Sequence, residues 1–242
     1  MTQKLQGVVI RSSDRKEKDK NILLFSLEDG KVWATLKGVK GPNAKMKIAQ
    51  NPFCYGEYIL EDGKAGKVVT GFEAIETFHE VSEDVDKYFE ASALLEIVGC
   101  MDFATKNETA QVFVLLLRSL KTLCFSKVLP LYVLNKFLIS IFEITGTPLV
   151  IDKCSNCDTK VFERVFMDYA TGELVCINCA KYGSEELEKT TFLALKYLKS
   201  TDFDKLHTLK LAQGSEMGLL RVLTKNFESR FDKTLKLIGI FS

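Results

Sequence analysis

The sequence predicts an α+β protein in which a small closed barrel of five β-strands, over residues 1–80, precedes a helical domain over residues 81–242. Three observations lead to this fold class. Short runs rich in Val, Ile, Phe and Tyr, separated by turn residues, fill the first part and are typical of strands. After Ser82, apolar residues recur at three- and four-residue steps, which is typical of helices. Two pairs of cysteines then mark a separate unit at about residues 149–182.

The barrel is predicted from five short strands that follow one another closely. Asp29-Gly30 lies between the second and third strands and is a strong signal for a hairpin turn. Closing the strands into a barrel hides the sheet edges that could otherwise pair with other chains. The expected strands are residues 4–11, 21–28, 31–37, 52–61 and 67–78.

The helical domain is predicted from apolar residues that share one face of each helix. The third helix is expected to stop at Gly146, with Pro148 beyond it, and Ser184 is a plausible N-cap for the fourth. Because the first three helices are apolar on wide faces, they should form the core of the domain. The expected helices include residues 88–98, 112–123, 131–144, 184–199 and 217–231.

Four cysteines form two CxxC pairs that are eighteen residues apart, namely Cys154, Cys157, Cys176 and Cys179. Each pair can present two thiolates to one tetrahedral ion, and a hairpin with its turn at residues 168–173 would bring the pairs together. Buried or disulfide-linked pairs are the alternative, and a redox role is disfavoured because no βαβ pattern surrounds either pair. We expect a structural Zn²⁺, since four thiolates leave the metal no open position.

Composition and charge exclude several classes of protein. Hydrophobic residues make up 46% of the chain and charged residues 27%, as in an ordinary globular protein. The start of the sequence has no apolar signal stretch, and no apolar run is long enough to span a membrane. Seven cysteines, four of them in a metal pattern, fit a reducing compartment. We therefore expect a cytoplasmic protein without a membrane partner.

The sequence contains no catalytic motif. A GxxxxGK[ST] phosphate loop, a GxGxxG turn and a GxSxG elbow are all missing from the sequence. His79 and His207 are the only histidines, and neither belongs to a pattern that joins a nucleophile, a base and an orienting group. We therefore expect that the protein is not an enzyme.

Positive charge is concentrated in the first part of the chain, where residues 31–56 contain five lysines and no acid. Lysines in loops beside a barrel can reach successive phosphates, a contact that is independent of base sequence. Trp33 or Phe25 could stack on a base, although either could instead belong to the core. The alternative is that these charged side chains only face solvent and bind nothing. The candidate nucleic-acid contacts are Arg11, Arg15, Lys16, Lys37, Lys40, Lys45 and Lys47.

Taken in order along the chain, these features resemble the RecO family of bacterial recombination mediators. In three places the chain departs from the family pattern: it lacks an aromatic-glycine-glutamate run after Arg11, it has Lys40 where an arginine is common, and its C-terminal segment 230–236 matches only loosely. The residues that carry the resemblance are Gly7-Val-Val-Ile-Arg11 with the charged segment 14–19, Asp29-Gly-Lys31, Lys37-Gly-Val-Lys40, Pro52-Phe53, Glu73-Ala-Ile-Glu76, and Gly146-Thr-Pro-Leu149 before the cysteine pairs.

The resemblance implies an oligonucleotide-binding (OB) barrel, a helical domain and an embedded zinc unit. It also implies a DNA-repair function without a nucleotide cofactor, in the cytoplasm and associated with the nucleoid. The protein would bind single- and double-stranded DNA, anneal complementary strands, and act with RecR to load RecA on strands coated by single-strand-binding protein. Two alternatives remain: an RNA- or protein-binding factor of transcription or translation that combines a zinc ribbon with an OB fold, and a protein-interaction scaffold.

The family's partner, single-strand-binding protein, has an acidic tail with an apolar end, so its receptor needs a cation beside apolar side chains. Arg118 and Lys121 are three residues apart and would share one face of a helix, where they could flank a carboxylate. Lys127 and Lys136 are further cations in the same region. The alternative is that these residues only keep an apolar helix soluble.

Overall fold

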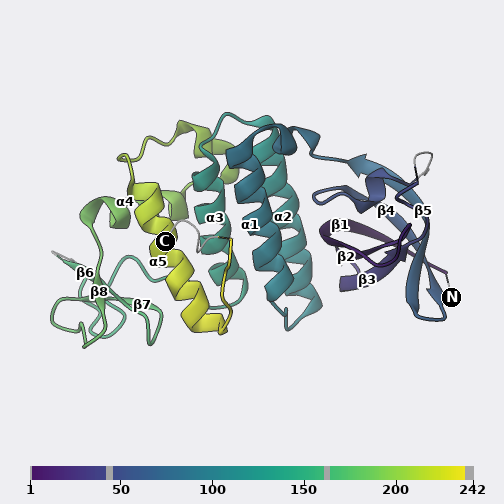
Figure 1. The fold of residues 1–242 in the computed structure, drawn as a ribbon. Helices are drawn as coiled ribbons and strands as arrows, with labels where there is room; N and C mark the ends of the chain where they lie inside the picture. The colour runs from purple at the N-terminus through teal and green to yellow at the C-terminus, as the bar shows by residue number, and fades with distance from the viewer. Residues whose placement is uncertain (1, 42–45, 161–163, 238–242) are drawn as a thin grey trace. The chain divides into compact units, whose positions relative to one another are not determined.

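A computed structural model describes residues 2–41, 46–160 and 164–237 of the chain (Figure 1). The chain divides into two compact units, residues 1–124 and residues 125–242. The first unit contains the barrel and two helices, and the second contains the cysteine unit and the remaining helices. Among the described residues, no helix has both the length and the apolar character needed to cross a bilayer.

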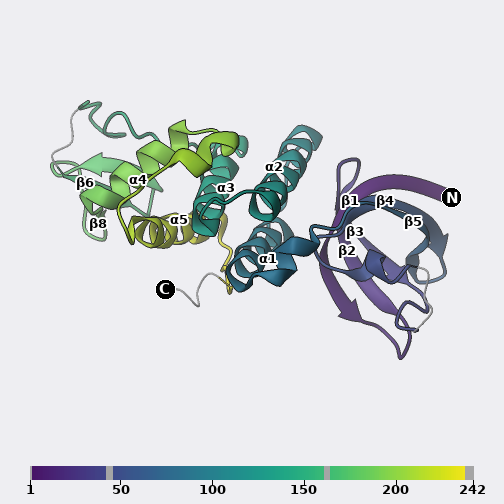
Figure 2. The same cartoon turned by 90° about the horizontal axis from the view of Figure 1, so that it is seen from above.

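The first unit begins with the predicted five-stranded barrel, which is closed in the strand order β1-β2-β3-β5-β4 (Figure 2). Neighbouring strands pair antiparallel except β3 and β5, which pair in parallel and complete the closure. The Asp29-Gly30 turn joins β2 to β3 as expected, and Gly30 adopts the φ of +68° that favours glycine. The strands are β1 (Thr2–Asp14), β2 (Lys20–Ser26), β3 (Gly30–Leu36), β4 (Tyr55–Gly63) and β5 (Gly66–Glu76).

The strands alternate between the interior and the outer face of the barrel, as the two-residue period of a strand requires. Ile22 and Leu24 of β2 and Ala34 of β3 are buried in the interior core. The outer face of β2 and β3 therefore carries the residues between them, including Trp33 and Thr35. A short 3₁₀ helix, Ile48–Gln50, precedes β4.

Two helices of the first unit cover one end of this outer face. The ring of Phe25 lies 5.6 Å from Phe103 and 5.9 Å from Phe113, measured between ring centroids. Lys31 Nζ donates to the carbonyl oxygen of Met101, just beyond the C-terminus of α1, at 2.6 Å. Phe25 and Lys31 thus attach the β2–β3 hairpin to the helices. The elements are the 3₁₀ helix His79–Glu83, α1 (Val85–Cys100) and α2 (Lys106–Phe125).

The second unit is built around α3, which packs against both α4 and α5. Pro130 begins α3 at a position where its missing N–H costs no hydrogen bond. A small sheet with the strand order β7-β6-β8 carries the cysteine unit. The elements are α3 (Pro130–Ile144), β6 (Val165–Asp168), β7 (Glu173–Cys176), β8 (Glu185–Glu186), α4 (Lys189–Ser200), the 3₁₀ helix Phe203–Thr208 and α5 (Ser215–Phe231).

The prediction that Ser184 caps the fourth helix is wrong. Helix α4 begins at Lys189, and the two residues after Ser184 form β8, which pairs with Phe166 and Met167 of β6. Ser184 Oγ instead accepts a hydrogen bond from the backbone N–H of Lys181 at 3.1 Å. Pairing with a strand distant in sequence therefore overrides the local capping signal.

Candidate metal centre and nucleic-acid interface

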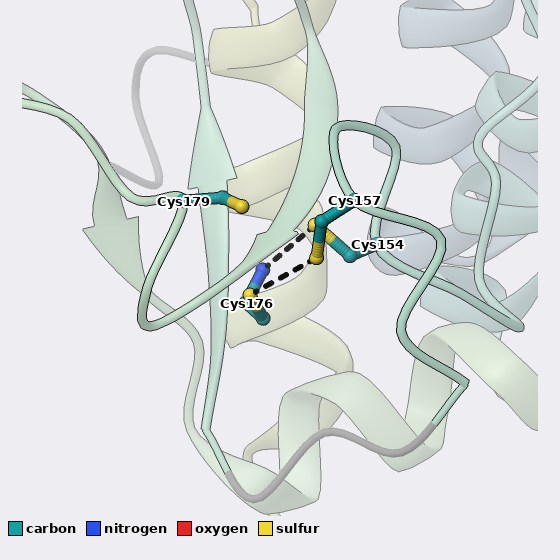
Figure 3. A group of neighbouring side chains, drawn as sticks. All are labelled: Cys154, Cys157, Cys176 and Cys179. Carbon is teal, nitrogen blue, oxygen red and sulfur yellow. Dashed lines mark hydrogen bonds between the residues drawn. The ribbon is translucent and has the colours of Figure 1, made fainter.

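The two CxxC pairs meet in the second unit, where the four Sγ atoms of Cys154, Cys157, Cys176 and Cys179 all lie within 4.8 Å of one another (Figure 3). The Sγ atoms of Cys157 and Cys176 are 3.7 Å apart. Thiolates that coordinate one tetrahedral Zn²⁺ at a Zn–S distance of about 2.3 Å would be separated by about 3.8 Å. The four side chains therefore fit a single metal ion.

Both knuckles are closed by a backbone hydrogen bond of the same type. The N–H of Asp158 donates to the carbonyl of Cys154 at 3.0 Å, and the N–H of Ala180 donates to the carbonyl of Cys176 at 2.9 Å. Each hydrogen bond closes a tight turn, which directs the two thiols of a pair to the same side. The spacing of a CxxC pair therefore determines the direction of its side chains.

The environment of Cys154 favours its thiolate form. Burial opposes ionisation, but backbone N–H groups of Cys176, Asn156 and Cys157 outweigh that effect and lower the pKa of Cys154 to about 6. The N–H of Cys176 lies 3.4 Å from Cys154 Sγ. Metal ligation requires a deprotonated thiol, so these amides prepare the site for a cation.

Helix α5 holds the hairpin that connects the two knuckles. Asn226 Nδ2 donates to the carbonyl of Gly172 at 3.0 Å, and Ser229 Oγ donates to the carbonyl of Tyr169 at 2.6 Å. Arg230 Nη1 reaches the carbonyl of Thr147 at 2.7 Å. The cysteine unit is thus part of the packing of the second unit.

In the first unit, the structure brings the two basic segments of the barrel together. The N–H of Gly38 donates to Asp19 Oδ1 at 2.9 Å, and the N–H of Lys40 donates to the carbonyl of Lys18 at 3.3 Å. Residues 37–41 therefore lie against the loop between β1 and β2. We call the described cations of these two segments, Arg15, Lys16, Lys18, Lys37 and Lys40, the basic surface.

Lys40 differs from the other members of the basic surface because its side chain links the two segments. Its Nζ lies 2.9 Å from Asp14 Oδ2 and donates to the carbonyl of Lys16 at 3.3 Å. The hydrogen bond and charge of Lys40 lower the pKa of Asp14, so this carboxylate stays ionised. The exposed Arg15, Lys16 and Lys37 are better placed to reach a ligand.

The other residues predicted to contact nucleic acid do not lie where these two segments meet. Arg11 is exposed on β1, where it pairs with Leu23 beside a β-bulge. Lys47 is exposed immediately before the 3₁₀ helix Ile48–Gln50. Lys45 lies outside the described residues.

The structure distinguishes the two aromatic residues considered for base stacking. Phe25 is completely buried and belongs to the packing between the barrel and the helices of the first unit. Trp33 is 51% exposed on the outer face of β3. Lys67 is a cation that sequence reasoning missed: the parallel pairing of β3 with β5 places it opposite Ala34, the residue that follows Trp33 in β3. No local pattern could have revealed this pairing.

The proposed partner-binding residues are both accessible. Arg118 and Lys121 are exposed on α2, whereas Ser119 and Leu120 between them are buried. Lys136, in contrast, cannot contribute to a receptor in the described structure. It is buried in α3, where its Nζ donates to the carbonyl of Lys199 at 3.0 Å.

Comparison with known proteins identifies the family. The family model described as Recombination protein O N terminal matches residues 1–78, and Recombination protein O C terminal matches residues 82–237. The DNA repair protein RecO of Clostridium perfringens is 29% identical, over 96% of this chain and 95% of the relative. The corresponding protein of Clostridium novyi is 25% identical, over 99% and 93%. The one from Acetivibrio thermocellus is 24% identical, over 95% and 92%. Because the second family model alone matches more than half of the sequence, the chain belongs to the Recombination protein O (RecO) family.

Proposed function

We propose that the protein is a non-enzymatic DNA-binding mediator of recombination in DNA repair. Membership of the RecO family and the names of the relatives support a role in recombination and repair. The observation that carries the DNA-binding part is the contact between residues 37–41 and the β1–β2 loop, which gathers cations from two segments. A surface of this kind binds the phosphate backbone whatever the base sequence.

The basic surface lies beside strands β2 and β3 of a closed five-stranded barrel. In OB folds, this face and its adjoining loops bind oligonucleotides. We propose that the basic surface binds both single- and double-stranded DNA, and that it anneals complementary strands by screening the repulsion between their phosphates. DNA as the ligand would place the protein at the nucleoid in the cytoplasm.

We propose that the four cysteines hold a structural Zn²⁺. Zn²⁺ suits four thiolates in a tetrahedron, and such a site leaves no position for a water or a substrate. Among the residues that the structure describes, few apolar side chains surround the knuckles, chiefly Val175 and Phe166. The ion would therefore supply much of the free energy that keeps the hairpin folded against α5.

The proposed partners follow from the family. RecR would act with this protein to load RecA on strands coated by single-strand-binding protein. The acidic tail of single-strand-binding protein would dock on α2, where Arg118 and Lys121 are exposed on one face. The apolar end of that tail would find Val114, which is 60% exposed and one turn from Arg118.

Strand annealing tests the proposed function most broadly. Complementary oligonucleotides that carry a donor and an acceptor dye are mixed with the protein, with and without single-strand-binding protein. We expect faster annealing in both conditions, because the protein would bind the strands and also recognise their coat. Binding of RNA in preference to DNA, without annealing, would instead support a factor of transcription or translation. The absence of any salt-dependent binding to nucleic acid would support a scaffold.

A further inference from the structure

An open hollow lies on the outer face of β2 and β3, within the first unit. Its walls come from three places in the sequence: the loop after β1, the strands β2 and β3, and the turn that leads into β5. Its volume is about 230 Å³. Sites for drug-sized ligands usually measure roughly 300–1,000 Å³, so this hollow suits one smaller group. The polar and aromatic lining includes Arg15, Asn21, Trp33, Thr35, Gly66 and Lys67.

A hydrogen-bonded chain positions a cation in this hollow. The Arg15 guanidinium donates to Thr35 Oγ1, and Thr35 Oγ1 donates to Asn21 Oδ1 at 3.2 Å. Thr35 is only 5% exposed, so its hydroxyl is fixed by the barrel. The guanidinium is therefore held against the barrel wall, in the hollow that Trp33 also lines.

A second cation lines the same hollow. Lys67 pairs with Asp62 on the β4–β5 hairpin, with Nζ 3.3 Å from Oδ1. Next to it, Gly66 adopts a φ of +106°, and apart from its chain neighbours no heavy atom of the described residues lies within 4 Å of the position where a Cβ would be. The hollow thus combines one exposed aromatic face, two cations and an open wall without a side chain.

We infer that this hollow binds one unstacked base of a DNA single strand, with the base stacked on Trp33 and the adjoining phosphates near Arg15 and Lys67. The inference rests on the proposed function and deepens it. A base of a duplex is paired and stacked on both faces, so it cannot reach the indole. Stacking on one aromatic side chain adds affinity for any unpaired base. Phosphate contacts are available in both single and double strands, so they do not supply this preference. The hollow gives the protein a preference for single strands that the basic surface alone does not supply.

Fluorescence can test this inference directly, because Trp33 is the only tryptophan in the sequence. The full-length protein is titrated with dye-labelled oligothymidylate and, separately, with a duplex of the same length. Tryptophan emission and dye anisotropy are recorded together. We expect the single strand to quench the emission over the same concentration range in which anisotropy rises, and the duplex to raise anisotropy with little quenching.

Two failures of this experiment are distinguishable. If the single strand raises anisotropy but leaves the emission of Trp33 unchanged, DNA binding stands and the inferred stacking is wrong. If neither DNA raises anisotropy, the proposed function fails and the inference fails with it.

Substitutions provide a second test. Trp33→Ala should weaken single-strand binding about 5- to 150-fold, the range expected for loss of one stacked base, while duplex binding changes less than about twofold. Trp33→Phe keeps an aromatic face and should recover most of the affinity. Ile75→Ala, on the 50% exposed Ile75 of β5, is the matched control and should bind both DNAs like the wild type. Wild-type affinity of Trp33→Ala for single strands would overturn the inference.

Discussion

The substitution Glu90→Gln should stabilise the first unit at neutral and alkaline pH and have little effect in acid. Glu90 lies on α1 and is only 4% exposed. Its Oε2 has no hydrogen-bond partner among the described residues. Burial, helped by the negative charge of Asp86, raises the pKa of Glu90 to about 7 from an ordinary value of 4.5. The carboxyl group is therefore held near the neutral form that Gln resembles.

The magnitude follows from linkage between protonation and folding. In the unfolded chain Glu90 loses its proton near pH 4.5, and in the folded chain near pH 7, so the folded state binds more protons between these values. Stability must then fall as the pH rises through this window and remain lower above it. A pKa difference of this size corresponds to about 3 kcal/mol, at about 1.4 kcal/mol for each unit.

Urea unfolding at pH 5 and pH 8 measures the effect, with Trp33 emission as the probe because this residue lies in the same unit as Glu90. We expect Glu90→Gln to resemble the wild type at pH 5 and to exceed its free energy of unfolding by up to about 3 kcal/mol at pH 8. Glu73→Gln, at an exposed position of β5, is the control and should change stability by less than about 0.5 kcal/mol at either pH. An equal effect of Glu90→Gln at both pH values would refute the reasoning.

Two further predictions concern the metal and the partner. Freshly purified, reduced protein should contain one zinc per chain by elemental analysis. The Cys154→Ser variant should lose zinc and have a lower melting temperature, because three thiolates and a hydroxyl bind the ion more weakly. Zinc-free wild-type protein would contradict this prediction. The double charge reversal Arg118→Glu and Lys121→Glu should abolish binding of the tail peptide of single-strand-binding protein in a calorimetric titration and leave naked-DNA binding intact. Unchanged peptide affinity would move the docking site elsewhere.

Local sequence signals predict the helices and strands of the fold. They do not predict the contacts between segments that are distant in sequence. The Asp29-Gly30 hairpin and the CxxC knuckles depend on residues that are neighbours in sequence, so both could be predicted. The parallel pairing of β3 with β5, which places Lys67 opposite Ala34, joins strands about thirty residues apart and has no local signature. The same limit explains why the capping signal at Ser184 predicts a helix although its neighbours join a sheet.

The candidate interface shows the same division. Charge counting indicated a basic first domain, and the structure brings two of its basic segments together. Counting could not show that Lys40 is engaged with Asp14 while Lys37 remains exposed, because that depends on the register of the loops. The exposure of Trp33 also depends on which face of β3 turns outward, which the alternation along the strand alone leaves open.

The central claim is that cations of the barrel bind DNA phosphates, and the salt dependence of binding tests it most directly. Lys16, Lys37 and Lys47 are exposed on the barrel, and a triple substitution to Ala removes three positive charges. Each lost phosphate contact should reduce the slope of log affinity against log salt on duplex DNA by about 0.9, so the triple variant should lose about 2.7. A control with the same charge change, at the exposed Lys196, Lys205 and Lys210 of the second unit, should keep the wild-type slope. An unchanged slope in the barrel variant would contradict the claim.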